Sequence, residues 1–292
     1  MKVLVTGGGG QLASALGASV PENVNLTVLS IDDLDITNDE AVQATVKSHS
    51  PNVIINTAAY TAVDKAESDA AMARAVNEEG ARHLAHAAAA IDARLIYPST
   101  DFVFDGSGSK PWKPDAPKNP LSVYGSTKSA GEDAVLQELP ERALVVRTAW
   151  LYASEGVNFV NNMLRLMRER DELTIVADQI GTPTWARSLA EAIWCMIDRN
   201  LTGTHHWTDL GSTSWYEFAV MIGEIAREMG ILDRMPRIEP IPSSDFPTPA
   251  RRPLYSVLDK TETWRALDGS NCIPPRPWHE NLRTMMVELK RA

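Results

Sequence analysis

Five short aliphatic runs alternate with helical patterns through the first half of the chain, and this alternation constrains the fold more than any other feature. The runs read KVLVT, LTVLS, NVIINTAA, ARLIYPST and ALVVRTA. Each is almost continuously apolar, which is typical of strands buried on both faces. The segments between them, such as QLASALGAS and DEAVQATVKSH, have helical spacing. The alternation predicts an α/β fold in which βαβ units build a Rossmann-type, doubly wound parallel sheet.

The pattern changes near residue 150. Proline-dense stretches such as IPSSDFPTPARRP appear, and six of the eight tryptophans follow residue 184. We therefore expect residues 1–150 to form a first domain and residues 151–292 to form a smaller mixed α/β lobe.

Charge and composition exclude several classes of function. The net charge is −10 with no cluster of Lys or Arg, which argues against nucleic-acid and membrane-surface binding. There is no apolar run long enough to span a membrane, and the opening MKVLVTG is typical of a strand and not of a signal peptide. We expect a cytoplasmic protein in which Cys195 and Cys272 are reduced thiols, with no metal site.

A glycine-rich stretch, VTGGGGQLASAL, joins the first strand to the first helix. Gly7, Gly10 and Ala13 fit G-x-x-G-x-x-G/A, and Gly8 with the last two also fits the dinucleotide spacing. Glycines allow close backbone approach to a pyrophosphate, and the helix N-terminus supplies free N–H groups. The motif predicts a dinucleotide site.

The end of the second strand leaves NADH and NADPH both open. The stretch reads VLSIDDLDITN, so neutral Ser30 stands at the strand end, Asp32 and Asp33 lie just beyond it, and no arginine is near. Asp35 is expected near the adenine.

Chemistry-bearing residues follow the fourth strand and open the helix after it. STDFVFDG supplies Ser99, Thr100 and Asp101 at the strand's carboxyl end, and VYGSTK supplies Tyr124 and Lys128 at i and i+4. Ligands of open α/β sheets bind outside the carboxyl ends of the strands. The spacing places the phenol and the ammonium on one helix face.

These motifs together resemble the extended short-chain dehydrogenase/reductases. The resemblance narrows through AAYTAVDKAE, STDFVFDG, VYGSTKSAGE, VVRTAWLY, DQIGTPTWARSLA and FPTPARRPLYSVLD, which look like the dTDP-4-dehydrorhamnose reductases over nearly the whole chain. That family uses NADPH or NADH to reduce the 4-keto group of a dTDP-linked deoxysugar to dTDP-L-rhamnose. The resemblance implies that the helix near residues 183–199 returns to the nucleotide-binding domain, so that the substrate-binding lobe is discontinuous.

The resemblance assigns roles to the reacting groups. Tyr124 is expected to be the general acid, and Thr100 to orient the substrate carbonyl. Lys128 is expected to lower the pKa of Tyr124 and to reach the nicotinamide ribose. Ser99 is interpreted as a structural or cofactor-side neighbour of this group.

Further residues follow from the matching motifs. The expected cofactor-binding residues are Gly7, Gly10, Gln11, Leu12, Asp35, Ile36, Ala58, Ala59, Tyr60 and Asn77, with Tyr124 and Lys128. The expected substrate-binding residues are Thr61, Val63, Asp101, Phe102, Trp150 and Arg252. For Arg252, a diphosphate contact and a solvated loop charge are left equally open.

One departure keeps alternatives open. The usual S-T-D-Y reads STDF here, so Phe102 lacks a hydroxyl that the pocket would otherwise present. The alternatives are a reductase of another nucleotide-linked keto-deoxysugar, or a non-catalytic NADP-binding subunit like the beta subunit of methionine adenosyltransferase. Whether the protein is a monomer or a homodimer is not decided by the sequence.

Overall fold

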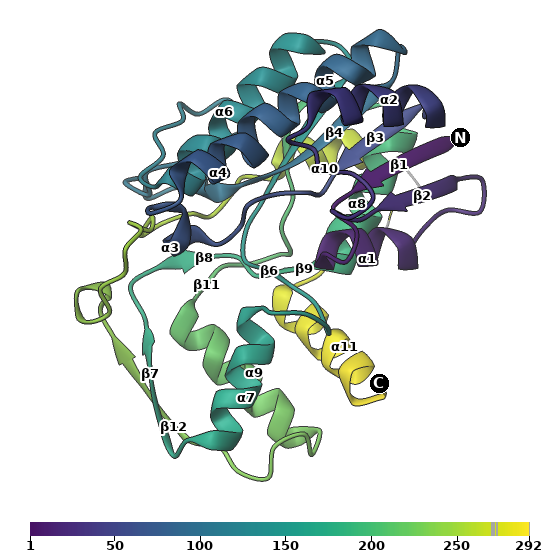
Figure 1. Ribbon diagram of the computed structural model, residues 1–292. Coiled ribbons are helices and arrows are strands. Elements are labelled where there is room, and N and C mark those ends of the chain that lie inside the picture. The colour runs from purple at the N-terminus through teal and green to yellow at the C-terminus, as the bar shows by residue number, and fades with distance from the viewer. Residues whose placement is uncertain (270–271, 273, 292) are drawn as a thin grey trace.

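A six-stranded parallel sheet forms the centre of the upper layer in the computed structural model, which describes residues 1–269, 272 and 274–291 (Figure 1). Its strand order is β10-β5-β4-β3-β1-β2. The strands are β1 (Lys2–Thr6), β2 (Asn25–Leu29), β3 (Val53–Asn56), β4 (Arg94–Thr100), β5 (Ala143–Thr148) and β10 (Gly203–His206). The predicted doubly wound parallel sheet is confirmed, and all five predicted runs lie in it. The order reverses beside β1, where open sheets bind their ligands.

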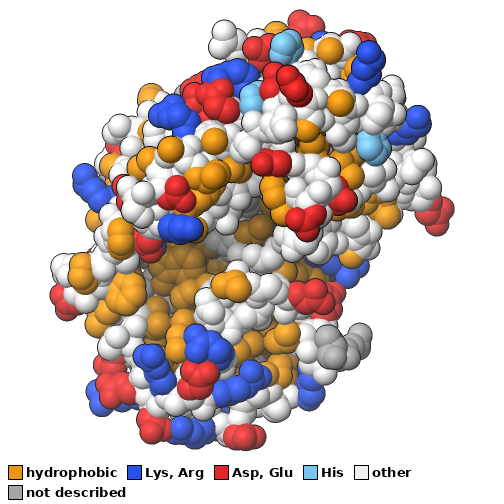
Figure 2. Space-filling view, viewed as in Figure 1, with side chains coloured by type: hydrophobic (Ala, Val, Ile, Leu, Met, Phe, Trp, Pro, Cys, Tyr) orange, Lys and Arg blue, Asp and Glu red, His pale blue; other side chains and the backbone are white. Residues whose placement is uncertain are grey.

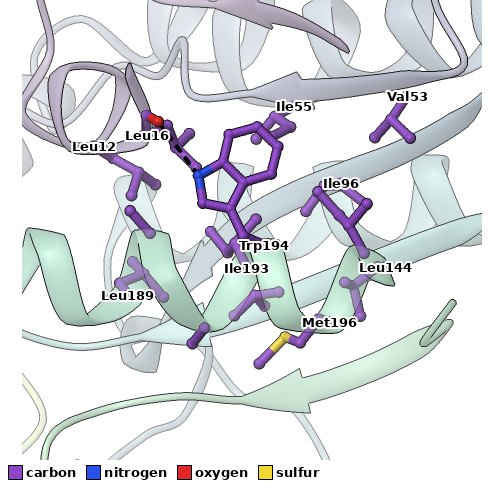
Figure 3. Packing of buried hydrophobic residues seen from close by; sticks show 14 of the residues in the cluster. Leu12, Leu16, Val53, Ile55, Ile96, Leu144, Leu189, Ile193, Trp194 and Met196 are labelled. Carbon is purple, nitrogen blue, oxygen red and sulfur yellow. Dashed lines mark hydrogen bonds between the residues drawn. The ribbon is translucent and has the colours of Figure 1, made fainter. Parts of the chain in front are cut away.

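Helices cover both faces of the sheet. One face packs under α2 (Asp39–His49), α5 (Gly80–Ala90) and α6 (Val123–Glu138). The other packs under α1 (Gln11–Ala18) and α8 (Ala186–Asp198), with α10 (Thr261–Leu267) at its margin. In Figure 3 the Trp194 indole of α8 lies among these aliphatic side chains, and its Nε1 donates to the carbonyl oxygen of Leu16. A segment from the second half of the chain therefore completes the core of the first.

The lower layer is a smaller mixed unit. It contains α7 (Phe159–Glu169), α9 (Trp215–Glu228), α11 (Trp278–Arg291) and the parallel pair β7 (Glu172–Val176) and β12 (Arg237–Ile241), packed around one apolar cluster. Short pairs join it to the upper layer: β6 (Leu151–Tyr152) with β9 (Thr184–Trp185), and β8 (Ile180–Gly181) with β11 (Thr213–Ser214).

The remaining elements are short. They are α3 (Val63–Ala66), α4 (Ala70–Arg74), the π-helical turn η1 (Ala75–Glu79) and the 3₁₀ turns η2 (Asp101–Val103) and η3 (Ser243–Asp245). The stretch MARAVNEEGARHLAHAAAA has one long helical pattern, but η1 separates α4 from α5 within it and turns Asn77 inward.

The expectation of two reduced thiols is wrong. Cys195 and Cys272 form a disulfide, with their Cα atoms 5.8 Å apart. Both cysteines pack against the α1/α8 side of the core, so folding brings together residues that are 77 positions apart. Sequence spacing alone gives no sign of such a contact. Within the described chain, no helix is both long and apolar enough to cross a membrane.

Candidate active site

A cavity of about 910 Å³ opens at the carboxyl edge of the sheet, between the two layers. Figure 2 shows this face hollowed there, with hydrophobic side chains in the recess. Every residue that the sequence predicts for cofactor or substrate binding lines this cavity, with the exception of Asn77. The wall draws on β1, β3, β4 and β5 and on the start of α6.

The glycine turn forms one end of the cavity. Gly7 has φ of +80°, and a Cβ there would lie 2.5 Å from the backbone nitrogen of Ala58. Gly10 begins α1 without any side-chain cap, so the first N–H groups of the helix remain free for a ligand. These features fit a pyrophosphate held by backbone groups at a helix N-terminus.

Asn77 supports the cavity wall from behind. Its buried amide bonds both the N–H and the carbonyl oxygen of Tyr60, at 2.9 and 3.1 Å, and its Nδ2 also donates to Thr127 Oγ1 at 3.1 Å. It therefore fixes the loop after β3 to α6. Asn77 thus braces the wall without lining the cavity, and its predicted contact with the cofactor stays a prediction.

Local packing fixes Tyr124 at the start of α6. Ser122 caps the helix by accepting from the Gly125 N–H at 3.1 Å. A Cβ on Gly125 would lie 2.3 Å from the carbonyl oxygen of Phe102, so only glycine lets α6 approach η2 this closely. The ring of Tyr124 meets Phe102 edge-on, with the centroids 5.6 Å apart.

The electrostatics of Tyr124 differ from the expectation. Burial raises the pKa of its phenol to about 12, and the Thr100 hydroxyl opposes this by hydrogen bonding. Burial therefore outweighs any lowering of this pKa by Lys128, whose Nζ binds the Pro98 carbonyl oxygen, and the role of Lys128 toward the phenol stays a prediction. A phenol with this pKa stays protonated at neutral pH, which is the state that a proton donor needs.

Lys128 is buried and held by the strand that carries Thr100. Its Nζ donates to the carbonyl oxygen of Pro98 at 2.8 Å and lies 3.9 Å from the centroid of the Tyr97 ring. Burial lowers the pKa of Lys128 to about 7, while the negative charge of Glu132 raises it.

A buried ion pair lies one helical turn beyond Lys128. Glu132 is fully buried, accepts two hydrogen bonds from Arg147 at 2.9 and 2.8 Å, and accepts a third from Ser99 Oγ at 2.5 Å. Ser99 therefore makes a structural contact and also lines the cavity, so both interpretations from the sequence stay open. Sequence reasoning does not identify Glu132, although the motif SAGE places it on the Lys128 face of the helix.

Asp101 brings a buried carboxyl group to the cavity. It is 2% exposed, and its Oδ2 has no hydrogen-bond partner among the described residues. Burial raises its pKa to about 6, against the lowering effect of the Ser256 and Thr100 hydroxyls. An unpaired buried acceptor that lines a cavity fits a ligand hydroxyl.

Arg252 is not a solvated loop charge in this structure. Its guanidinium pairs with Asp64 at 3.0 and 2.8 Å, and the same pair lowers the pKa of Asp64. The residue still lines the cavity and bridges the loop before Pro253 to α3.

Several lining residues are missing from the sequence predictions. Trp215 stacks on Trp150 with ring centroids 3.5 Å apart, and Thr148 stands at the end of β5 with a buried hydroxyl that has no partner among the described residues. Thr148 follows from the rule that strand ends meet at one edge. Trp215 does not, because it comes from the other layer. The described residues contain no cluster of three or more metal-ligating side chains.

Comparison with known proteins identifies the family. Residues 1–291 match the family model described as the RmlD substrate binding domain. A dTDP-4-dehydrorhamnose reductase from Streptomyces griseus is 43% identical over 96% of this chain and 91% of its own length. The protein of that name from Escherichia coli K12 is 40% identical over 99% of this chain and 98% of its own length.

Solved structures agree with this. The crystal structure of a dTDP-4-dehydrorhamnose reductase from Clostridium acetobutylicum has a TM-score of 0.92 and 40% identity, covering 99% of this chain and 100% of the other. That of the Bacillus anthracis protein, in complex with NADP, has a TM-score of 0.91 and 37% identity, covering 98% and 99%. The chain therefore belongs to the dTDP-4-dehydrorhamnose reductase family of oxidoreductases.

Proposed function

We propose that the protein uses NADPH or NADH to reduce the 4-keto group of dTDP-4-dehydro-6-deoxy-L-mannose, which yields dTDP-L-rhamnose. The observation that carries this is the convergence of Thr100, Tyr124 and Lys128 on one wall of a cavity whose far end is the glycine turn. Membership of the reductase family and the NADP complex of the Bacillus anthracis relative support the choice of substrate and cofactor.

The residues present fit a nicotinamide dinucleotide. Gly7 and Gly10 with the N-terminus of α1 would hold the pyrophosphate, and Lys128 would meet the nicotinamide ribose. When bound, the reduced cofactor supplies the hydride that adds to the carbonyl carbon.

The proton comes from the chain itself. Tyr124 Oη donates its proton to the carbonyl oxygen as the carbon accepts the hydride, so the ketone becomes a secondary alcohol and the tyrosine becomes a phenolate. The Thr100 hydroxyl, which lowers the pKa of Tyr124, would hold the same carbonyl oxygen in line. The nearby Lys128 ammonium favours the phenolate electrostatically once it forms.

Asp101 and Arg252 would bind the substrate. The unpaired Oδ2 of Asp101 would accept a hydrogen bond from a sugar hydroxyl. Arg252 would contact the diphosphate from its place beside Asp64, since its planar fork suits phosphate oxygens.

Product analysis tests the proposal. The protein, incubated with NADH or NADPH and enzymatically made dTDP-4-keto-L-rhamnose, is expected to consume one cofactor per sugar and to yield dTDP-L-rhamnose by mass and proton NMR. Sugar-independent oxidation, or no turnover with either cofactor, would contradict it. Phe102 favours one second candidate, a related keto-deoxysugar that needs no hydroxyl at this position, and a panel of such sugars distinguishes the two.

A further inference from the structure

The carboxyl end of β2 lies where the adenosine part of a bound dinucleotide would be expected. The Gly8 N–H donates to the carbonyl oxygen of Leu29 at 2.8 Å, so the chain after Leu29 lies directly beside the glycine turn. In dinucleotide-binding folds, the residue at this strand end meets the 2′ position of the adenosine ribose. That residue is Ser30 here.

Ser30 does not offer its polar groups to a ligand. Its backbone N–H and its Oγ both donate to Asp33 Oδ2, at 2.9 and 2.7 Å. Asp33 is exposed, and these two hydrogen bonds lower the pKa of its carboxyl group. A carboxylate is thus fixed onto the residue that would meet the ribose.

The surroundings add negative charge and no compensating positive charge. Asp32 and Asp35 are exposed on the same loop. There is no Lys or Arg from residue 3 to residue 46, a stretch that covers all of β1 after Lys2, all of α1 and β2, and most of α2.

The described lining of the cavity, which includes Ile31 and Asp35 of this loop but neither Ser30 nor Asp33, brings no cation to this end either. Its Lys and Arg residues are Lys128, which binds the Pro98 carbonyl oxygen, and Arg252, which is paired with Asp64. His83 of α5 reaches the loop after β2, but its Nδ1 bonds the carbonyl oxygen of Ile36 at 3.0 Å.

NADPH differs from NADH by a phosphate on this ribose. A phosphate monoester carries roughly −1.5 to −2 charges at neutral pH. Sites that accept this group provide an arginine near the strand end, whereas an acidic residue there favours a free 2′-hydroxyl. An exposed carboxylate beside this ribose repels a 2′-phosphate, and dissolved salt screens that repulsion.

We propose that this protein prefers NADH to NADPH because the Asp33 carboxylate, held on Ser30, repels a 2′-phosphate. The inference rests on the proposed function, since it concerns the cofactor of that reaction. Asp33 is the residue that determines the preference, and Ser30 positions it.

Cofactor binding without sugar tests this directly. Quenching of tryptophan fluorescence is titrated with NADH and with NADPH at low ionic strength. We expect NADH to bind roughly tenfold or more tightly. The difference is expected to shrink as sodium chloride is added, because the repulsion is screened.

Two variants separate the effect of the Asp33 carboxylate from the effect of removing any negative charge nearby. Asp33→Asn is expected to tighten NADPH binding by roughly tenfold and to leave NADH nearly unchanged. Asp39→Asn removes an equal charge from the first turn of α2, where Asp39 accepts from Gln43 at 3.2 Å, and is expected to leave the NADH to NADPH ratio unaltered.

The outcomes separate the two proposals. Wild-type protein that binds NADPH as tightly as NADH, or an unchanged ratio in Asp33→Asn, would overturn the inference and leave the reductase intact. Failure of both nucleotides to bind would overturn the proposed function and the inference with it.

Discussion

Gly7 shows how one residue position decides whether a cofactor can approach. An alanine there adds a Cβ 2.5 Å from the Ala58 nitrogen at φ of +80°. Gly9 has φ of +87°, and a Cβ there would have nothing within 4 Å, so Gly9→Ala bears the backbone strain alone. We expect Gly7→Ala to lose about 2 kcal/mol or more of stability and most cofactor binding, and Gly9→Ala to lose about 1 kcal/mol. Thermal unfolding and nucleotide titration check this, and equal effects would contradict it.

The buried carboxyl group of Asp101 makes the free energy of unfolding depend on pH. Burial raises its pKa from 3.8 to about 6, so the folded state prefers the protonated carboxyl more than the unfolded state does. Its contribution to the free energy of unfolding is therefore full below pH 4 and is lost as pH rises through 6. Removing it in Asp101→Asn is expected to flatten the stability curve between pH 4 and 7 by on the order of 2–3 kcal/mol. Parallel wild-type and variant curves in denaturant titrations would contradict this.

The contact between α6 and β4 holds Thr100, Tyr124 and Lys128 in place. Lys128 binds the Pro98 carbonyl oxygen, and Glu132 accepts a hydrogen bond from Ser99. Two side chains one turn apart on α6 therefore hydrogen-bond to the two residues that precede Thr100. Arg147 of β5 forms an ion pair with Glu132, and Lys118 lies 3.4 Å from the same carboxylate. We call these contacts of Lys128 and Glu132 the α6–β4 clamp.

Glu132→Gln tests this clamp. It leaves buried Arg147 without its charge partner, for which we expect a loss of about 3–5 kcal/mol in unfolding free energy. It also removes the charge that raises the pKa of Lys128, so the alkaline limb of the kcat profile is expected to shift to lower pH, with kcat falling more than KM rises. Glu228→Gln breaks an exposed pair with Arg283 and serves as control, with an expected change of less than about 1 kcal/mol. A pH profile that does not move would leave Glu132 with a structural role only.

In the molecule as a whole, segments from the second half of the chain complete the sheet and the core of the first half. The outer strand β10 pairs with β5, and α8 covers the apolar face formed by β1, β3 and α1. A fragment of residues 1–150 would expose that face and leave β5 as an open edge. We expect it not to unfold cooperatively by circular dichroism, whereas the intact chain does. A sharp transition in the fragment would contradict this.

The sequence predicts the sheet and the cavity well, because both depend on local patterns. Aliphatic runs define the strands, and the carboxyl ends of parallel strands must meet, so Thr100 and Tyr124 come together as expected. Contacts set by tertiary packing are not predictable in this way. The Cys195–Cys272 disulfide joins distant segments, and Trp215 reaches the cavity from the opposite layer. The raised pKa of Tyr124 reflects burial, which no spacing of residues encodes.

The most direct test of the whole account is the sugar-dependent fall in absorbance at 340 nm for wild type, Tyr124→Phe and Ser126→Ala. Ser126 is exposed on the same helix and reports any general effect of substitution there. We expect Tyr124→Phe to lower kcat by roughly 10²–10⁴-fold while still binding the nicotinamide cofactor, because it removes the proton donor and little else. Ser126→Ala is expected to match wild type. A Tyr124→Phe enzyme with near wild-type kcat would show that this phenol does not supply the proton.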